Sequence, residues 1–284
     1  MGDEERQLAG KISGPGDAPG TPRTFKLTLA YDGSGFRGWQ VQPGLPTIQG
    51  ELQAALGRVT GERPLPQGSG RTDAGVHALA QVASFQLAAP IPAENLLRAL
   101  NRTLPGAIRV LEARVVSDTF HARHSAVAKT YQYRIFRGEI CPPWVFPFVY
   151  VYSRKLDFKS LESAAQVFVG EHDFTSFAAT DPDVACRNAI DGEAVDAATN
   201  VRTVFSSVWE QEENADGELW IYRVRGDGFL HHMVRNFVGA MIDAGRGSTT
   251  VERLREILAA RSRSEAGPTA PASGLFLTSV EYAE

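Results

Sequence analysis

The loop Gly68-Ser69-Gly70-Arg71-Thr72-Asp73-Ala74-Gly75-Val76-His77 is the most informative stretch of the sequence. Its glycines allow tight backbone turns beside a strand. In an extended backbone, Arg71 points to the same face as Asp73, and a basic neighbour keeps a nucleophilic carboxylate ionised. An aspartate that caps a structural turn fits the same residues. The loop contains neither GxGxxG nor GxxxxGK[ST], which disfavours a nucleotide-binding fold.

Hydrophobic periodicity around this loop predicts a mixed α+β protein. We expect two halves with a similar order of elements, sharing one sheet with a cleft between them. The boundaries we expect are a disordered tail at 1–22, halves at 23–125 and 126–284, and an acidic loop insertion near 179–200. The expected strands are 25–31, 80–87, 107–116, 127–137, 202–211, 218–226 and 275–282, and the expected helices are 47–59, 92–103, 157–168, 230–244 and 250–261.

Two further stretches carry side chains suited to a functional site. In Lys129-Thr130-Tyr131-Gln132-Tyr133-Arg134-Ile135-Phe136, the alternation predicts a strand with both tyrosines on one face. Tyr131 suits either core packing or stacking on an extruded base. In the segment 226–237, His231, His232 and Arg235 interrupt an apolar helix face, so they either bind a ligand or pair internally.

The distribution of charge permits a nucleic-acid partner. The whole chain has a net charge of −4, but residues 1–22 hold −2 and residues 178–218 hold −8, so the rest carries +6. Most of the positive residues are arginines, whose planar guanidinium groups bind phosphate in a bidentate way. Surface arginines that only aid solubility fit the same count.

Composition limits the cofactors and the cellular compartment that we expect. There are two cysteines, Cys141 and Cys186, and we expect both to be reduced in a cytoplasmic protein. Neither the cysteines nor the histidines form a recognised metal-binding pattern, and adjacent histidines on a helix point about 100° apart. We therefore expect no metal. No apolar run is long enough to cross a membrane.

Several motifs, in order along the chain, resemble the TruA family of tRNA pseudouridine synthases. The most specific is Gly70-Arg71-Thr72-Asp73-Ala74-Gly75-Val76-His77-Ala78. The resemblance extends from about Phe25 to Tyr282, and its other motifs are Tyr31-Asp32-Gly33, Gly38-Trp39-Gln40, Phe174-Thr175-Ser176-Phe177 and His231-His232-Met233-Val234-Arg235-Asn236. The acidic insertion and the tail depart from the simplest family members, but neither touches the catalytic positions.

The resemblance implies a fold, a reaction and a set of site residues. The fold would be the pseudouridine synthase fold, with two ferredoxin-like α+β halves sharing a mixed, mostly antiparallel sheet. Asp73 matches the essential aspartate, Tyr131 the tyrosine that stacks on the target uracil, and Arg235 the basic partner of the aspartate. Leu277 matches an apolar residue beside the base, and Arg71 an arginine that contacts RNA.

The implied enzyme is a homodimer that isomerises uridines 38–40 in the anticodon stem-loop of tRNA. It would need neither cofactor nor metal, and no other protein partner. Two other classes fit parts of the sequence. A non-catalytic tRNA-binding protein of the same fold would bind without isomerising. An aspartate-dependent hydrolase would need a second carboxylate near Asp73, which no local motif supplies.

Overall fold

A computed structural model describes residues 20–179 and 199–283 and has the expected α+β architecture. One mixed sheet runs through it in the order β4-β1-β3-β10-β5-β9-β8-β7, with β2 added beside β3 and β6 beside β5. The strands are β1 (Arg23–Tyr31), β2 (Gln67–Gly68), β3 (His77–Leu87), β4 (Ile108–Val116), β5 (Ala126–Phe136), β6 (Tyr150–Val151), β7 (Gly170–Asp173), β8 (Val201–Asn214), β9 (Gly217–Gly226) and β10 (Leu275–Tyr282).

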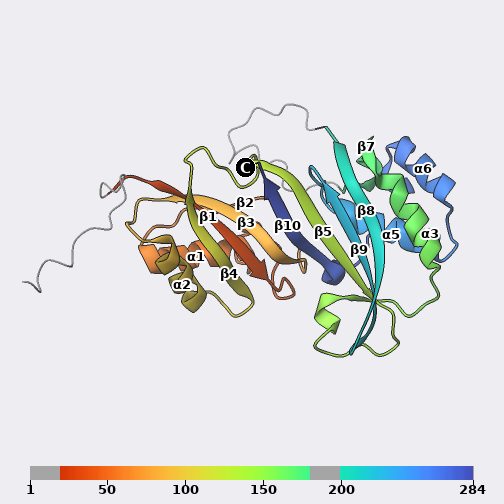
Figure 1. Cartoon of the computed structure of the whole chain (residues 1–284), viewed down its shortest axis with the longest axis horizontal. Coiled ribbons are helices and arrows are strands. Elements are labelled where there is room, and N and C mark those ends of the chain that lie inside the picture. Colours follow the sequence, from red (N-terminus) through yellow and green to blue (C-terminus); the bar gives the residue numbers. More distant parts are fainter. Residues whose placement is uncertain (1–19, 180–198, 284) are drawn as a thin grey trace, which may run out of the picture.

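The helices gather at the two ends of this sheet and leave β10 and β5 between them (Figure 1). At one end lie α1 (Ile48–Thr60) and α2 (Ala93–Thr103), and at the other α3 (Phe158–Ala165), α5 (Met233–Gly245) and α6 (Val251–Ala260). Thr47, Asp157 and Thr250 cap α1, α3 and α6, each side chain accepting a hydrogen bond from a backbone N–H of the first turn.

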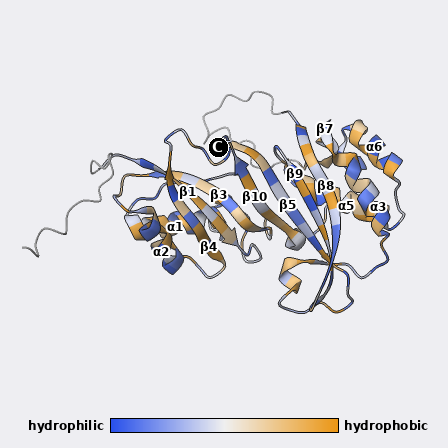
Figure 2. Cartoon of the chain, viewed as in Figure 1, coloured by the Kyte–Doolittle hydropathy of each residue, from blue (hydrophilic) through white to orange (hydrophobic). Residues whose placement is uncertain are grey.

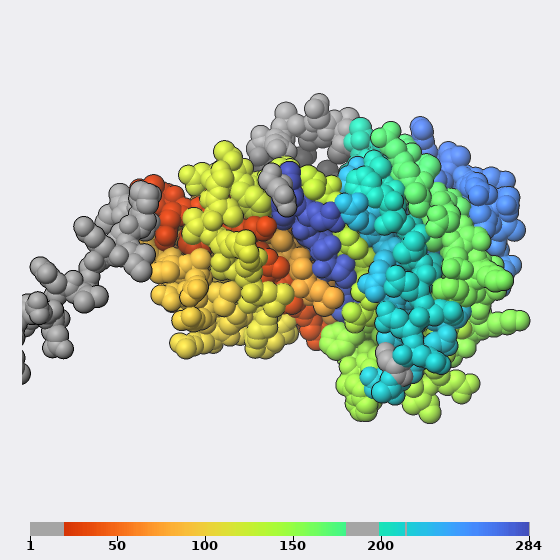
Figure 3. All heavy atoms as spheres, in the orientation of Figure 1, coloured from red at the N-terminus to blue at the C-terminus, as the bar shows by residue number. Residues whose placement is uncertain are grey.

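Most neighbouring strands are antiparallel, but β10 pairs with β3 in parallel and with β5 antiparallel. The parallel contact is short, with Phe276 opposite His77 and Leu277 opposite Ala78. In the space-filling view, the dark blue β10 lies between the N-terminal strands and the later strands β8 and β9 (Figure 3). The last strand of the chain therefore joins the two ends of the sheet.

Alternating side chains build a continuous core under the sheet. Hydrophilic and hydrophobic residues alternate along the strands (Figure 2). On β1, Phe25, Leu27 and Leu29 are fully buried, as their spacing predicts. At the other end, the rings of Phe168 and Phe237 stack with centroids 4.0 Å apart.

The predicted elements are confirmed, with differences at their ends. The helix expected at 230–244 begins only at Met233, because His232 has a left-handed backbone with φ of 60°. The helix expected at 157–168 ends at Ala165 and continues as a 3₁₀ turn at Gln166–Phe168. The tail predicted at 1–22 lies mostly outside the described residues. Nearly all of the predicted insertion also lies outside them, together with Cys186. Cys141 is a free thiol.

The proposed division of the chain at residue 125 stays a prediction.

Among residues 20–179 and 199–283, no helix combines the length and the apolar character needed to cross a bilayer.

Candidate active site

The loop that carries Asp73 connects β2 to β3 and is fixed through its backbone. Trp39 N donates to Thr72 O at 2.9 Å, and Gly75 N donates to Phe36 O at 3.3 Å. The buried hydroxyls of Tyr31 and Thr72 lie 2.8 Å apart, within hydrogen-bond distance. Contacts on both sides of Asp73 therefore hold it in position before any substrate arrives.

Two glycines from the segment after β1 make this close packing feasible. A Cβ atom on Gly33 would lie 2.0 Å from Val76 O, and one on Gly38 would lie 2.6 Å from Thr72 O. Gly38 also has a φ of +91°, which side chains rarely tolerate. These glycines let the backbone of the segment 33–38 lie directly against the loop.

Arg235 on α5 is the partner of the Asp73 carboxylate. Its Nη1 donates to Asp73 Oδ2 at 2.8 Å, and its Nε donates to Ala270 O at 2.8 Å. Both side chains of the ion pair are mostly buried. The sequence singled out Arg71 as a basic neighbour that would keep Asp73 ionised, but the guanidinium that bonds to the carboxylate belongs to Arg235.

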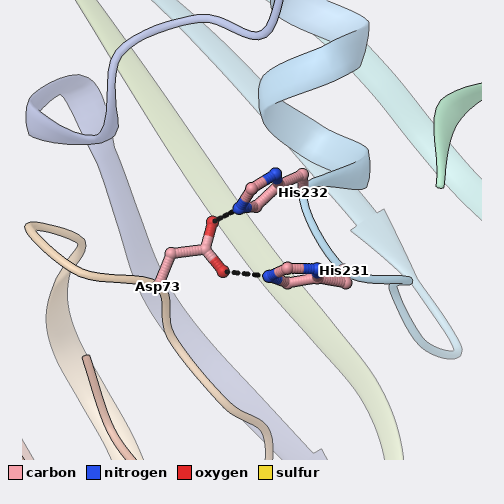
Figure 4. A group of neighbouring side chains, drawn as sticks. All are labelled: Asp73, His231 and His232. Carbon is pink, nitrogen blue, oxygen red and sulfur yellow. Dashed lines mark ion pairs between the residues drawn. The ribbon is translucent and has the colours of Figure 1, made fainter. Parts of the chain in front are cut away.

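His231 and His232 also face the carboxylate (Figure 4). The Nε2 atom of His231 lies 3.5 Å from Asp73 Oδ1, and that of His232 lies 3.4 Å from Oδ2. Burial is the main cause that lowers the pKa of His232 from its usual value, and it outweighs the opposing effect of Asp73. The expectation that the two rings diverge on a helix was wrong, because both residues precede α5 and their ring centroids lie 3.9 Å apart.

Tyr131 lies in the same cleft, on the central strand β5. Its ring packs edge-on against Phe229, with centroids 5.1 Å apart, and burial raises the pKa of its hydroxyl well above the usual range. Leu277 sits opposite Tyr131 on β10 but is fully buried. Leu275, two residues earlier on the same strand face, lines the cleft instead.

The cleft has a volume of about 1070 Å³ and a mainly basic lining. Among the described residues, six arginines and lysines and two aspartates line it: Arg37, Arg71, Arg123, Lys129, Arg202, Arg263, Asp73 and Asp227. Lys129 donates from Nζ to Ser69 O at 2.6 Å. Burial, helped by Arg123 and Arg202, lowers the pKa of Lys129 to about 8. Such a cleft suits a polyanion such as RNA.

The comparisons with known proteins agree with this geometry. The family model described as tRNA pseudouridine synthase matches residues 28–125 and 164–283, which include Asp73, the histidine pair and Arg235. The chain belongs to the tRNA pseudouridine synthase family. Members of such a family are isomerases that convert uridine in tRNA to pseudouridine, and this chain is therefore a tRNA-modifying enzyme.

Individual tRNA pseudouridine synthases match over almost their whole length. The protein named tRNA pseudouridine synthase A from Solibacter usitatus is 51% identical over 260 residues, covering 92% of this chain and 100% of the relative. Its namesakes from Moorella thermoacetica and Lacticaseibacillus casei are 44% and 43% identical, each covering 91% of this chain and 99% of the relative.

Some residues of this candidate site were predicted from the sequence and others were not. The structure brings Asp73, Tyr131 and Arg71 to one cleft, places Arg235 in contact with Asp73, and keeps Leu277 behind the cleft wall. Lys129 and Phe229, which also line the cleft, were not predicted as site residues. Phe229 lies beside the histidine pair in the sequence, and Lys129 is on the strand face of Tyr131, so strand alternation could have identified it.

Proposed function

We propose that this enzyme converts uridines 38–40 in the anticodon stem-loop of tRNA to pseudouridine, with Asp73 as its nucleophile. The observation that carries the proposal is the Asp73 carboxylate, fixed by Arg235 at 2.8 Å inside a basic cleft. The family match supplies the reaction. The choice of uridines rests on the motif resemblance, and relatives named tRNA pseudouridine synthase A support tRNA as the substrate.

The reaction rearranges bonds without gaining or losing atoms. The bond between ribose C1′ and uracil N1 breaks, the uracil turns, C1′ bonds to C5, and the proton on C5 leaves as N1 gains one. Asp73 can add to C6 of the uracil, attack C1′, or take the C2′ proton. Each route uses the carboxylate that Arg235 holds in place through a hydrogen bond from its Nη1 to Oδ2 at 2.8 Å.

Tyr131 and Arg71 would bind the extruded nucleotide. Removing a base from the helical stack costs a few kcal/mol, which stacking on an aromatic ring and contacts to phosphate offset. The Tyr131 ring is held by Phe229, so it offers a fixed surface beside Asp73. In this proposal Leu277 supports the ring of Tyr131 from the neighbouring strand, and Leu275 meets the base from the cleft wall.

The proposed enzyme works in the cytoplasm as a homodimer, with each tRNA lying across both subunits. Three large apolar side chains in the segment between β5 and β6 support a second copy as the partner. Ile140, Trp144 and Phe146 are 89, 67 and 61% exposed. Exposed apolar groups of this size are typical of protein interfaces.

Tritium release from an anticodon stem-loop labelled at C5 of its uridines tests the proposal. The C5 proton leaves only when the new C–C bond forms, so wild-type protein should release tritium and Asp73→Asn should release none while still binding tRNA. Asp118→Asn, on a loop away from the cleft, is the control and should keep full activity. Full activity of Asp73→Asn would refute the assignment.

A second substrate separates the alternative functions. A stem-loop with cytidines at positions 38–40 should bind to the protein but release no tritium. A non-catalytic tRNA-binding protein would bind the uridine substrate without releasing tritium. A hydrolase would liberate free uracil, which chromatography of the reaction detects.

A further inference from the structure

The atoms around Asp73 are spaced as the ligands of one metal ion are. The Nε2 atoms of His231 and His232 lie 3.5 and 3.4 Å from the carboxylate oxygens, and the three ligand atoms all lie within 4.8 Å of one another. Zinc bonds to nitrogen and oxygen at about 2.0–2.2 Å, so two ligands of a tetrahedral ion are separated by about 3.4 Å. We propose that Asp73, His231 and His232 form an inhibitory binding site for a divalent transition-metal ion.

The chemistry of these ligands selects zinc and similar ions. Two imidazoles and one carboxylate suit Zn²⁺, and also Co²⁺ or Ni²⁺, whereas Mg²⁺ prefers oxygen ligands alone. Among the described residues, this is the one group that joins three such side chains. The rings of His121 and His124 also lie close together, with centroids 4.3 Å apart, but belong to no such group.

The site is assembled before an ion arrives. Figure 4 shows both rings turned toward the carboxylate from the segment that leads into α5. The left-handed backbone of His232 brings two neighbouring residues to the same side. Backbone hydrogen bonds hold both residues, because Ala179 N donates to His231 O and Asn236 N to His232 O, each at 2.9 Å. Little conformational entropy remains to be lost when the ion binds.

An ion can reach this site from the cleft. The side chains of Asp73, His231 and His232 are 17, 28 and 29% exposed, and all three line the cleft wall. With three protein ligands, a fourth position stays open to water, as in zinc sites that exchange ligands. The ion is therefore bound reversibly.

Arg235 opposes the ion and keeps its affinity modest. The guanidinium already donates to Asp73 Oδ2, so a metal ion must share the carboxylate with a fixed positive charge. Arg235 holds Oδ2, the oxygen that also faces His232, whereas Oδ1 faces His231, so the ion must draw the two rings toward one carboxylate oxygen. Removing the charge of Arg235 should therefore tighten metal binding even though it harms the enzyme.

The effect of the ion on catalysis rests on the proposed function, whereas metal binding itself does not. An ion bound to Asp73 withdraws the carboxylate that would attack the nucleotide, and it occupies the position where the nucleotide enters. Zinc should therefore inhibit isomerisation, compete with tRNA, and be displaced by EDTA.

Metal binding is measured first, without reference to activity. Metal-free wild-type protein should take up one Zn²⁺ per chain in competition with a chromophoric chelator, and Co²⁺ should give the visible absorption of a four-coordinate site. His231→Ala and His232→Ala should each weaken zinc binding at least tenfold, and Arg235→Gln should strengthen it several-fold. The matched control is His124→Ala, which removes a histidine that also lines the cleft and should leave zinc binding unchanged. Equal zinc binding by wild type and both His→Ala variants would overturn the site.

Inhibition is measured second, by tritium release with increasing Zn²⁺ and then with EDTA. Wild type should lose at least nine-tenths of its activity and regain it on chelation, whereas Mg²⁺ at the same concentration should have no effect. Zinc that binds at these histidines without inhibiting would overturn the inhibitory role. The proposed function fails separately, if Asp73→Asn retains activity.

Discussion

The pairing of Asp73 with Arg235 is the contact on which the site depends most. The pair is mostly buried, and the guanidinium is fixed by a second hydrogen bond to Ala270 O. A hydrogen bond to a charged group contributes about 1.5–3 kcal/mol, which corresponds to about 10- to 100-fold in rate.

We therefore expect Arg235→Gln to lower kcat for isomerisation by about 10- to 100-fold, with a smaller change in tRNA affinity. Single-turnover tritium release and filter binding measure the two quantities. Arg255→Gln, which removes an exposed ion pair on α6, is the control and should behave as wild type. An unchanged kcat in Arg235→Gln would mean that Asp73 needs no guanidinium partner.

Lys129 should make tRNA binding depend on pH in a range where most lysines do not titrate. Burial lowers its pKa to about 8, so the side chain is mostly charged at pH 7 and mostly neutral at pH 9. The pKa of Lys129 in the folded protein lies below its ordinary value, so the folded state binds the proton less tightly than the unfolded state does. The contribution of Lys129 to the free energy of unfolding therefore rises as the pH rises above about 8.

Between pH 7 and 9 we expect wild type to lose about two- to tenfold in tRNA affinity, the effect of one phosphate contact. Lys129→Gln should bind more weakly at pH 7 and show a flatter pH profile. Lys26→Gln, where the ammonium group lies over the Tyr282 ring outside the cleft, should keep the wild-type profile. Parallel pH profiles for Lys129→Gln and wild type would exclude a contact between Lys129 and a tRNA phosphate.

At the residue scale, the sequence predicted which residues belong to the candidate site, but it did not predict how all of their side chains are arranged. Asp73 was predicted from its loop and from the motif resemblance. The two rings of His231 and His232 could not be placed, because the prediction assumed a helix. In the structure His232 has a left-handed backbone, and His231 O accepts a hydrogen bond from Ala179 N, which is distant in the sequence. The burial of Leu277 likewise depends on strand pairing with β5 and β3.

Among the elements, α5 carries Arg235, so its position sets that of the guanidinium. A Cβ on Gly239 would lie 1.9 Å from Pro268 O, so the helix lies directly against the segment 268–270. That segment also receives the Nε–H of Arg235 through Ala270 O. A shift of the helix therefore moves the partner of Asp73.

Gly239→Ala should destabilise the protein by about 1–3 kcal/mol, as overpacking does, and should lower kcat as well. Gly57→Ala in α1 is the matched control, because its Cβ would meet only the flexible side chain of Arg63. That control should be neutral or gain up to about 1 kcal/mol from its better helix propensity. Urea unfolding measures both, and a Gly239→Ala variant as stable as Gly57→Ala would contradict the close packing.

Element types followed from local periodicity, but some ends and pairings did not. The strand expected at 202–211 extends to Asn214, because Glu212 and Glu213 pair across the β8–β9 hairpin although both are charged and exposed. No local pattern predicts that β10 pairs in parallel with β3, since that contact joins residues almost 200 positions apart.

For the molecule as a whole, we expect the exposed apolar segment between β5 and β6 to hold the dimer. The double variant Trp144→Ser/Phe146→Ser should shift the protein from dimer to monomer in light scattering and lower its activity, because the tRNA would lie across both subunits. Leu111→Ser removes a side chain of similar exposure on β4 and should stay dimeric. A wild-type protein that is monomeric at micromolar concentration would refute the dimer.

The central place of β10 has a consequence for synthesis of the chain. Among the described strands, β10 at residues 275–282 is the last to be made, yet it fills the gap between β3 and β5. While a ribosome still holds this segment, the two earlier groups of strands lack their common neighbour, and the edges of β3 and β5 stay open. We therefore expect the nascent protein to complete its cleft, which Leu275 of β10 helps to line, only after β10 has emerged.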